Sequence, residues 1–146
     1  METTLGSNWA LMGAVLVGSS VYLCGGSDNE EMTSKKLIRL DLRSMQVTSL
    51  SKMTMKRNYL CLTNVNNSIY AIGGNYTNER LSTAERYDIN KNQWYDIQPM
   101  SKRRSDAGIA TVNSIIYVVG GFDGSKVHNS VAVSYTHLTL PTICSV

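Results

Sequence analysis

Short apolar segments alternate with polar, glycine-containing segments along most of the chain. The alternation is clearest in the middle of the sequence, where β-branched and aromatic residues gather in four runs, at 59–66, 68–74, 81–89 and 93–100. Asn, Gly and Asp residues separate these runs, which is the pattern of short strands joined by tight turns. No window combines a sustained helical apolar period with capping residues. The pattern therefore predicts an all-β fold in which any helix is short.

An internal repeat organises these strands. An apolar run that contains a tyrosine ends in a pair of glycines three times, at Gly26, Gly74 and Gly121, with spacings of 48 and 47 residues. The register extends beyond the glycines, because Met53 and Met100 also lie 47 residues apart. A period of about 40–50 residues that holds four strands is typical of a propeller blade.

The repeated residues resemble kelch repeats. The resemblance rests on these residues of the second copy and the start of the third: Gly73-Gly74, Glu85-Arg86-Tyr87-Asp88, Trp94, Met100 and Arg104. It extends from about Leu5 to Val131. It implies an all-β, partial kelch β-propeller of about two and a half to three four-stranded antiparallel blades.

The repeat also divides the chain. We assign a first repeat to residues 1–52, a complete second repeat to 53–99, a truncated third repeat to 100–132 and a tail to 133–146. The first repeat is degenerate, because Ile38, Leu40 and Val47 stand where kelch repeats have Glu, Tyr and Trp. The tail lacks the kelch landmarks and resembles a translated adaptor or vector sequence, so we expect it to be non-native and without function. The alternative is a genuine alternative terminus.

Residues that recur at the repeat period are expected to hold the blades together. Glycine permits positive φ and close approach of a neighbouring backbone at the end of an inner strand. Large aromatic side chains with one polar edge suit packing between blades. The expected structural residues are Gly25, Gly26, Tyr70, Gly73, Gly74, Glu85, Tyr87, Trp94, Tyr117, Gly120 and Gly121.

The strand order predicts which loops could contact a partner. In an antiparallel meander, the connections between repeats and those between the second and third strands emerge at the same end of each blade. These loops are longer and more basic than the turns at the other end, so we place partner contact there. The candidates are Lys56, Arg57, Asn58, Tyr76, Arg103, Arg104, Ser105, Phe122, Lys126 and His128. Arg57 and Arg104 recur at the repeat period, so a structural role for both stays open.

Composition narrows the class of protein. The chain has 146 residues, 17% of them charged, a net charge of +3 and three cysteines, which indicates a globular protein of a reducing compartment. Residues 9–26 carry no charge, but they are the first copy of the repeat and contain several glycines, so we expect no membrane segment and no signal peptide. Nucleic acid is disfavoured because the basic pairs lie a blade apart and no stacking series accompanies them. We expect a cytoplasmic protein.

Catalytic chemistry is not predicted. The glycine-rich segment 120–126 lacks the spacing of a phosphate-binding loop, and the cysteines and histidines lack metal-ligand spacing, so we expect no enzyme activity, cofactor or metal. The resemblance to BTB-kelch proteins implies a substrate adaptor that binds a protein target, with an acidic peptide as one form of it. A BTB domain, which these 146 residues do not contain, would dimerise and bind a cullin. An actin-binding cytoskeletal protein is the alternative, and a propeller oxidase is less favoured.

Overall fold

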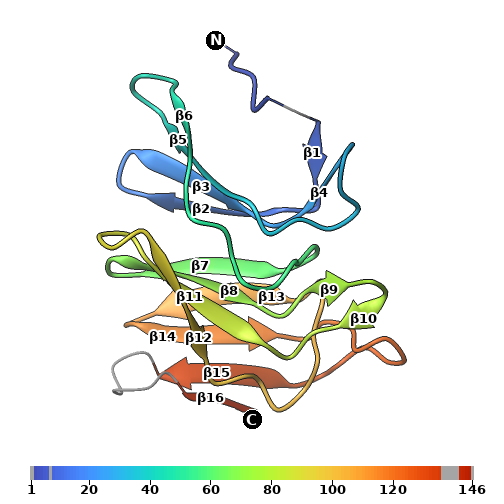
Figure 1. Ribbon diagram of the computed structural model, residues 1–146. Coiled ribbons are helices and arrows are strands. Elements are labelled where there is room, and N and C mark those ends of the chain that lie inside the picture. The colour runs from blue at the N-terminus through green and yellow to red at the C-terminus, as the bar shows by residue number, and fades with distance from the viewer. Residues whose placement is uncertain (1, 7, 136–141, 146) are drawn as a thin grey trace.

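The computed structural model describes residues 2–6, 8–135 and 142–145, the last four by their backbone alone. Every regular element in these residues is a β-strand, and the main ones form three four-stranded antiparallel sheets. The sheets are stacked side by side, with β7 between β2 and β13 (Figure 1). This is the arrangement of consecutive propeller blades, so the predicted all-β, partial propeller fold is confirmed.

Each blade is a meander of four strands in chain order. The first blade contains β2 (Gly13–Val17), β3 (Ser20–Cys24), β5 (Leu37–Asp41) and β6 (Val47–Ser49). The second blade contains β7 (Cys61–Val65), β8 (Ser68–Ile72), β11 (Ala84–Asp88) and β12 (Gln93–Ile97). The third blade contains β13 (Gly108–Val112), β14 (Ile115–Val119), β15 (Val131–Tyr135) and β16 (Thr142–Ser145). Short ribbons of β1 (Trp9–Ala10) with β4 (Ser27–Asp28), and of β9 (Asn75–Tyr76) with β10 (Glu79–Arg80), lie in the loops.

The third sheet extends past residue 132, the expected end of the third repeat. Residues 133–135 belong to β15, and residues 142–145 form β16. Val133 pairs with Cys144 and Tyr135 with Thr142. The segment assigned to a tail therefore supplies part of the third strand and all of the fourth. Because strand pairing uses backbone groups, a sequence without kelch landmarks can still complete the sheet. That the tail is non-native stays a prediction.

Two apolar layers lie between the blades. The layer between the first and second blades includes Tyr22, Leu62, Ile69, Tyr87 and Trp94, all at most 8% exposed. The ring centroids of Tyr87 and Trp94 lie 5.2 Å apart, and the indole Nε1 donates to the Ser51 carbonyl over 2.7 Å. The expected structural aromatics of the second repeat therefore lie between blades.

The layer between the second and third blades is built in the same way. It includes Tyr70, Ile72, Met100, Ile116 and Val118, all at most 4% exposed. Tyr117 occupies the position of Tyr70 in the next repeat but is only half-buried, because it lies on the outer face of the third blade.

The double glycines bring consecutive repeats together. Gly73 has a φ of 64°, and a β-carbon there would overlap the Arg104 carbonyl oxygen. The amide of Gly74 donates to that same oxygen over 2.8 Å. Gly26 donates in the same way to the Arg57 carbonyl over 2.7 Å. Only glycine leaves room for the loop that enters the next blade to approach so closely.

Candidate functional site

The loops that precede β7 and β13 meet the loops between the second and third strands of the blades at one end of the molecule, which we call the rim. Asn58 and Asn75 exchange backbone hydrogen bonds of 3.0 and 2.7 Å. Ser105 and Phe122 exchange two more, each 2.9 Å long. The rim is therefore a backbone framework that repeats from blade to blade, on which side chains vary.

Arg57 lies inside this framework, not on its surface. The residue is 0% exposed, and its Nη2 atom lies 3.0 Å from Oε2 of Glu85. Its Nη1 atom donates to the carbonyls of Gly73 and Thr83 over 2.9 and 2.8 Å. The interpretation of Arg57 as a partner contact is corrected here, because every donor is directed into the second blade.

Glu85 connects this arginine to the segment that enters the blade. Its carboxylate accepts the backbone N–H of Thr54 over 2.8 Å, that of Met55 over 3.2 Å and the Thr54 hydroxyl over 2.7 Å. Glu85 and Arg57 are each 1% exposed in their side chains. The pair is a structural link within the second repeat, which is the role that the sequence left open for Arg57.

Arg104 occupies the equivalent place in the third blade and is 1% exposed. It donates to the Gly120 carbonyl, to the Ser130 carbonyl over 3.0 Å and to the Ser130 hydroxyl over 2.7 Å. By strand register its carboxylate partner would stand at position 132, where the sequence has Ala132. Its expected role as a partner contact is likewise corrected, because its side chain is enclosed by its own blade.

Three further candidates are also buried. Asn58 is 6% exposed, and its Nδ2 atom donates to the Met32 carbonyl and to Ser27 Oγ over 3.2 Å each. Ser105 is 1% exposed. His128 is 9% exposed, and its Nε2 atom lies 3.2 Å both from the Arg103 carbonyl and from Oδ2 of Asp123. These side chains stiffen the loops that carry the exposed residues.

The other five candidates reach the surface of the rim. Tyr76 is 37% exposed, and Lys126 and Arg103 are exposed. Lys56 is half-buried, with its Nζ atom 3.5 Å from Oε1 of Glu31. Phe122 is half-buried beneath the Arg80 guanidinium, whose carbon lies 5.1 Å from the ring centroid.

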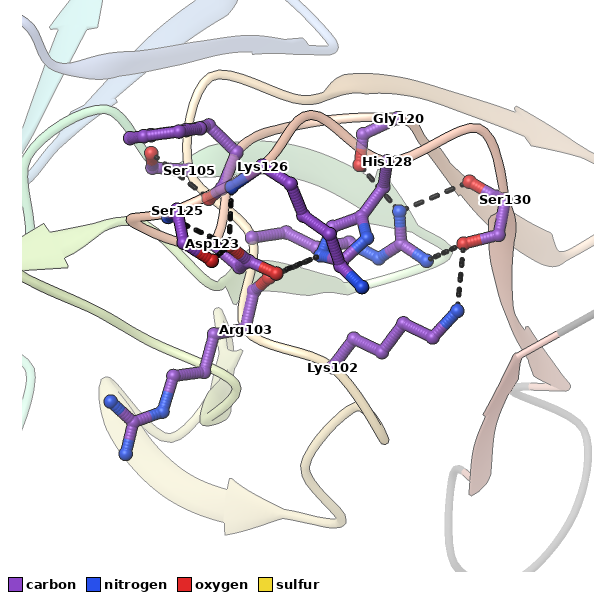
Figure 2. A network of polar contacts seen from close by, with 11 residues as sticks. Lys102, Arg103, Ser105, Gly120, Asp123, Ser125, Lys126, His128 and Ser130 are labelled. Carbon is purple, nitrogen blue, oxygen red and sulfur yellow. Dashed lines mark hydrogen bonds and ion pairs between the residues drawn. The ribbon is translucent and has the colours of Figure 1, made fainter.

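A shallow basic pocket of about 300 Å³ lies on the rim of the third blade (Figure 2). Its lining residues are Lys102, Arg103, Asp123, Ser125, Lys126 and His128. Asp123 is the only carboxylate among them, and its Oδ1 atom accepts the backbone N–H groups of Ser125 and Lys126 over 2.9 Å each. These bonds, that of Lys126 first, lower the pKa of Asp123 from 3.8 to about 2. The carboxylate is thus held by its own loop, and Lys102, Arg103 and Lys126 add three positive charges to the lining, although the Arg103 guanidinium is directed away from the two lysine ammonium groups (Figure 2).

A second hollow, the loop groove, lies between the first and second blades and encloses about 540 Å³. Its apolar walls include Leu11, Met32 and Tyr59, which are 41%, 90% and 40% exposed. Asn75 and Asn78 contribute amide groups. The other lining residues are also polar: Ser27, Asp28, Thr33, Asn58 and Thr77. The three apolar side chains offer a small apolar surface within a polar groove.

Leu11 and Tyr59 were not among the residues predicted from the sequence. Leu11, Tyr59 and Asp106 lie at one repeat position and all have positive φ, at 60°, 52° and 55°. The amide of Tyr59 donates to the Leu11 carbonyl and that of Asp106 to the Tyr59 carbonyl, over 3.1 Å each. Three chemically different side chains therefore stand on one repeated backbone position. That chemical difference at a fixed repeat position is the signal by which the sequence could have revealed them.

Other kinds of site find no support in the described residues. Across 2–6, 8–135 and 142–145, no group of three or more His, Cys, Asp or Glu side chains could hold a metal ion. Within the same residues, no helix is long and apolar enough to cross a membrane. Cys24 and Cys61 are free and buried, and burial raises the pKa of both thiols, that of Cys61 to about 11.

Comparison with known families agrees with the geometry. Residues 8–138 match the model of the KLHDC2/KLHL20/DRC7 Kelch-repeats domain. The chain belongs to the kelch-repeat family. Kelch repeat-containing protein kel-10 of Caenorhabditis elegans is 32% identical over 124 residues, which is 82% of this chain and 21% of that protein. A kelch repeat and BTB domain-containing protein of the same organism has the same identity and coverage.

Vertebrate kelch proteins are similar too. Human Kelch-like protein 25 is 29% identical over 86 residues, which is 59% of this chain and 14% of that protein. The chain thus spans about a fifth or less of these relatives. Kelch repeats are generally modules that bind other proteins, so the chain is a protein-interaction module.

Proposed function

We propose that this kelch module recognises the target of an adaptor for a cullin-based ubiquitin ligase, and that the rim is the surface that contacts the target. Two observations support the adaptor role. One is the resemblance to BTB-kelch proteins, for which we further propose a particular similarity to kelch-like protein 10 in the segments 103–108 and 120–124. The other is the relative whose name includes a BTB domain. A BTB domain in the same polypeptide would supply dimerisation and the cullin contact.

The target segment is acidic, and the basic pocket carries this part of the proposal. Lys102, Arg103 and Lys126 present three cationic groups beside one carboxylate that its own loop already holds. The Nη1 atom of Arg103 also lies 2.8 Å from Oε1 of Glu79, and both side chains are more than half exposed. Because water screens such an exposed ion pair, a peptide carboxylate could replace Glu79 at little cost in free energy. A nucleic acid is disfavoured because Arg57 and Arg104, two of the basic residues of the rim, are buried.

An apolar side chain of the same target segment would occupy the loop groove. The backbone at Leu11 and Tyr59 is held at positive φ by the blade-to-blade hydrogen bonds, so the direction in which each side chain leaves the backbone is set before a partner arrives. Pre-organised contacts lose less conformational entropy on binding than mobile ones. We also propose that the protein acts in the cytoplasm and without a membrane, where the free thiols of Cys24 and Cys61 would stay reduced.

The acidic-target proposal predicts a specific response to charge reversal. A glutamate-rich peptide with one leucine, labelled with fluorescein, serves as the probe in fluorescence anisotropy. The double variant Lys102→Glu with Lys126→Glu should bind this peptide about tenfold more weakly or worse, because two contacts of roughly 0.5–1 kcal/mol each become repulsive. Added salt should weaken binding to the unaltered chain.

A matched control distinguishes the effect of this pocket on binding from the effect of the net charge of the chain. Arg43→Glu with Lys91→Glu makes the same change in net charge on exposed turns at the opposite end of the blades. Circular dichroism verifies that both double variants fold. Equal weakening by both pairs, or no weakening by Lys102→Glu with Lys126→Glu, would remove the basic pocket from the binding site.

The adaptor role is tested in the full-length protein. We expect it to co-purify with a cullin and to promote ubiquitination of its target, and the Lys102→Glu with Lys126→Glu variant should retain the cullin while losing the target. Absence of cullin binding together with co-sedimentation with actin filaments would favour a cytoskeletal role instead. A copper-dependent oxidase activity would contradict both.

A further inference from the structure

The two lysines of the basic pocket lack the carboxylate partners that other cations of the rim have. Lys56, in the loop before β7, has its Nζ atom 3.5 Å from Oε1 of Glu31. Lys102 and Lys126 both line the basic pocket and are exposed (Figure 2). Neither forms an ion pair with any residue that the structure describes. The pocket therefore presents two ammonium groups that remain available to an anion.

Ser130 adds a hydrogen-bond donor next to one of these ammonium groups. Its hydroxyl oxygen accepts from Nη2 of Arg104 over 2.7 Å and from Nζ of Lys102 over 3.4 Å. A serine hydroxyl has two acceptor sites and one proton, so these two contacts leave only the proton for a further partner. Among the described residues, that proton has no acceptor. The hydroxyl is therefore set to donate to an anion held by Lys102.

The buried guanidinium of Arg104 adds another positive charge beside Ser130. Arg104 is 1% exposed, and buried charges are screened much less by salt than exposed ones. Strand register places Ala132 where the second blade has Glu85, the carboxylate that pairs with Arg57. Within the described residues, the Nε atom of Arg104 has no hydrogen-bond partner. The charge of Arg104 thus adds to the positive potential of the pocket.

The charges of the pocket lining and of the residues connected to it by hydrogen bonds or ion pairs do not cancel. The cationic side chains are Lys102, Arg103, Arg104 and Lys126. Two carboxylates oppose these four cations, Asp123 in the lining and Glu79 beside Arg103. With His128 neutral, two positive charges remain unbalanced. One carboxylate of a target would offset only half of that surplus.

We propose that the target segment carries a phosphorylated serine or threonine whose phosphate binds between Lys102 and Lys126 and accepts the Ser130 proton. This inference rests on the function proposed above, because it names the acidic group of the same target. A phosphate monoester carries about −1.5 to −2 charges at pH 7 and has three acceptor oxygens, which match two unbalanced charges and three donors. A glutamate side chain has one charge and two oxygens, so it leaves one ammonium group unpaired. The rim therefore selects the phosphorylated form of its target.

Peptides that differ at one position test this assignment on the complete chain. The glutamate-rich peptide with one leucine is compared with two versions in which one glutamate is replaced by phosphoserine or by serine. Each is labelled with fluorescein, and binding is measured by fluorescence anisotropy. The phosphoserine peptide should bind about tenfold more tightly than the glutamate peptide, because a second ammonium group gains a charge-assisted hydrogen bond. The serine peptide should bind most weakly.

Neutral variants show where the phosphate binds. The double variant Lys102→Gln with Lys126→Gln should lose most of the preference for phosphoserine over glutamate, because both ammonium groups are removed. Arg43→Gln with Lys91→Gln is the matched control, since it removes two charges from exposed turns at the opposite end of the blades and should keep the preference. Circular dichroism verifies that both double variants fold.

The possible results separate this inference from the function proposed for the rim. Equal binding of the phosphoserine and glutamate peptides would overturn the phosphate site and leave the acidic-target proposal standing. If none of the three peptides binds, both proposals are wrong. A preference for phosphoserine that persists in Lys102→Gln with Lys126→Gln would place the phosphate outside the basic pocket. Displacement of the labelled phosphoserine peptide by inorganic phosphate as effectively as by the unlabelled peptide would make free phosphate the ligand instead.

Discussion

Buried charge is the feature that most clearly separates structural from functional residues in this protein. Arg57 and Glu85 lie 3.0 Å apart, fully enclosed, and Glu85 also fixes the backbone of Thr54 and Met55. Arg103 and Glu79 lie 2.8 Å apart, but both are more than half exposed. The two ion pairs therefore have similar distances between nitrogen and oxygen but differ in their exposure to water. Burial makes the first one a structural link and leaves the second available to a partner.

Removing one partner from each pair should have very different effects on stability. Glu85→Ala leaves the buried Arg57 guanidinium without its counterion, so the free energy of unfolding should fall by about 3–5 kcal/mol. Glu79→Ala should lower it by less than about 1 kcal/mol, because water screens the exposed pair. Urea denaturation at one protein concentration gives both values. Equal losses for the two variants would contradict the structural role of Glu85.

At the scale of elements, the double glycine positions the connection between blades. Gly73 and Gly74 directly follow the last residue of β8, and the amide of Gly74 donates a hydrogen bond to the Arg104 carbonyl. The loop that enters the third blade therefore lies directly against the second blade. This contact explains why the glycine pair recurs where a strand ends and another repeat approaches.

Substitution at Gly73 should reveal the close approach as well as the backbone conformation. Gly18 and Gly73 have similar φ values of 59° and 64°, but nothing lies within 4 Å of a β-carbon at Gly18, whereas one at Gly73 would overlap the Arg104 carbonyl. Gly18→Ala should lower the free energy of unfolding by about 1–2 kcal/mol, because alanine pays only the cost of the left-handed backbone conformation there. Gly73→Ala should cost clearly more in the same urea titration. A loss no larger than that of Gly18→Ala would contradict the proposed contact.

The strands of the second blade could be predicted closely from the sequence. The runs at 59–66, 68–74, 81–89 and 93–100 contain β7, β8, β11 and β12, because alternation and turn residues act locally. The ribbons β1–β4 and β9–β10 were not predicted, since each has only two residues per strand and depends on the folded loops. The pairing of β16 with β15 depends on backbone groups, which an apolar pattern does not specify.

At the scale of the whole molecule, the sequence predicted partner contact at one end of the blades but could not separate surface from interior there. Arg57 and Arg104 stand in basic pairs that suggest an exposed site, yet the fold turns their side chains inward. Tyr59 lies in the predicted strand run 59–66, although its positive φ places it on the rim, where it is 40% exposed. Side-chain direction in such loops is set by contacts with residues far along the chain, such as Glu85 for Arg57, which no short segment of sequence encodes.

The position of a bound peptide on the blades tests the central claim most directly. Amide chemical shifts of the isotope-labelled chain are measured by NMR as the glutamate-rich peptide with one leucine is added. We predict the largest shifts at Lys102, Arg103 and Lys126 around the basic pocket and at Tyr59 in the loop groove. Shifts concentrated at the opposite turns, 66–67 and 90–92, or no shifts on the rim, would contradict the assignment of the rim as the partner-binding surface.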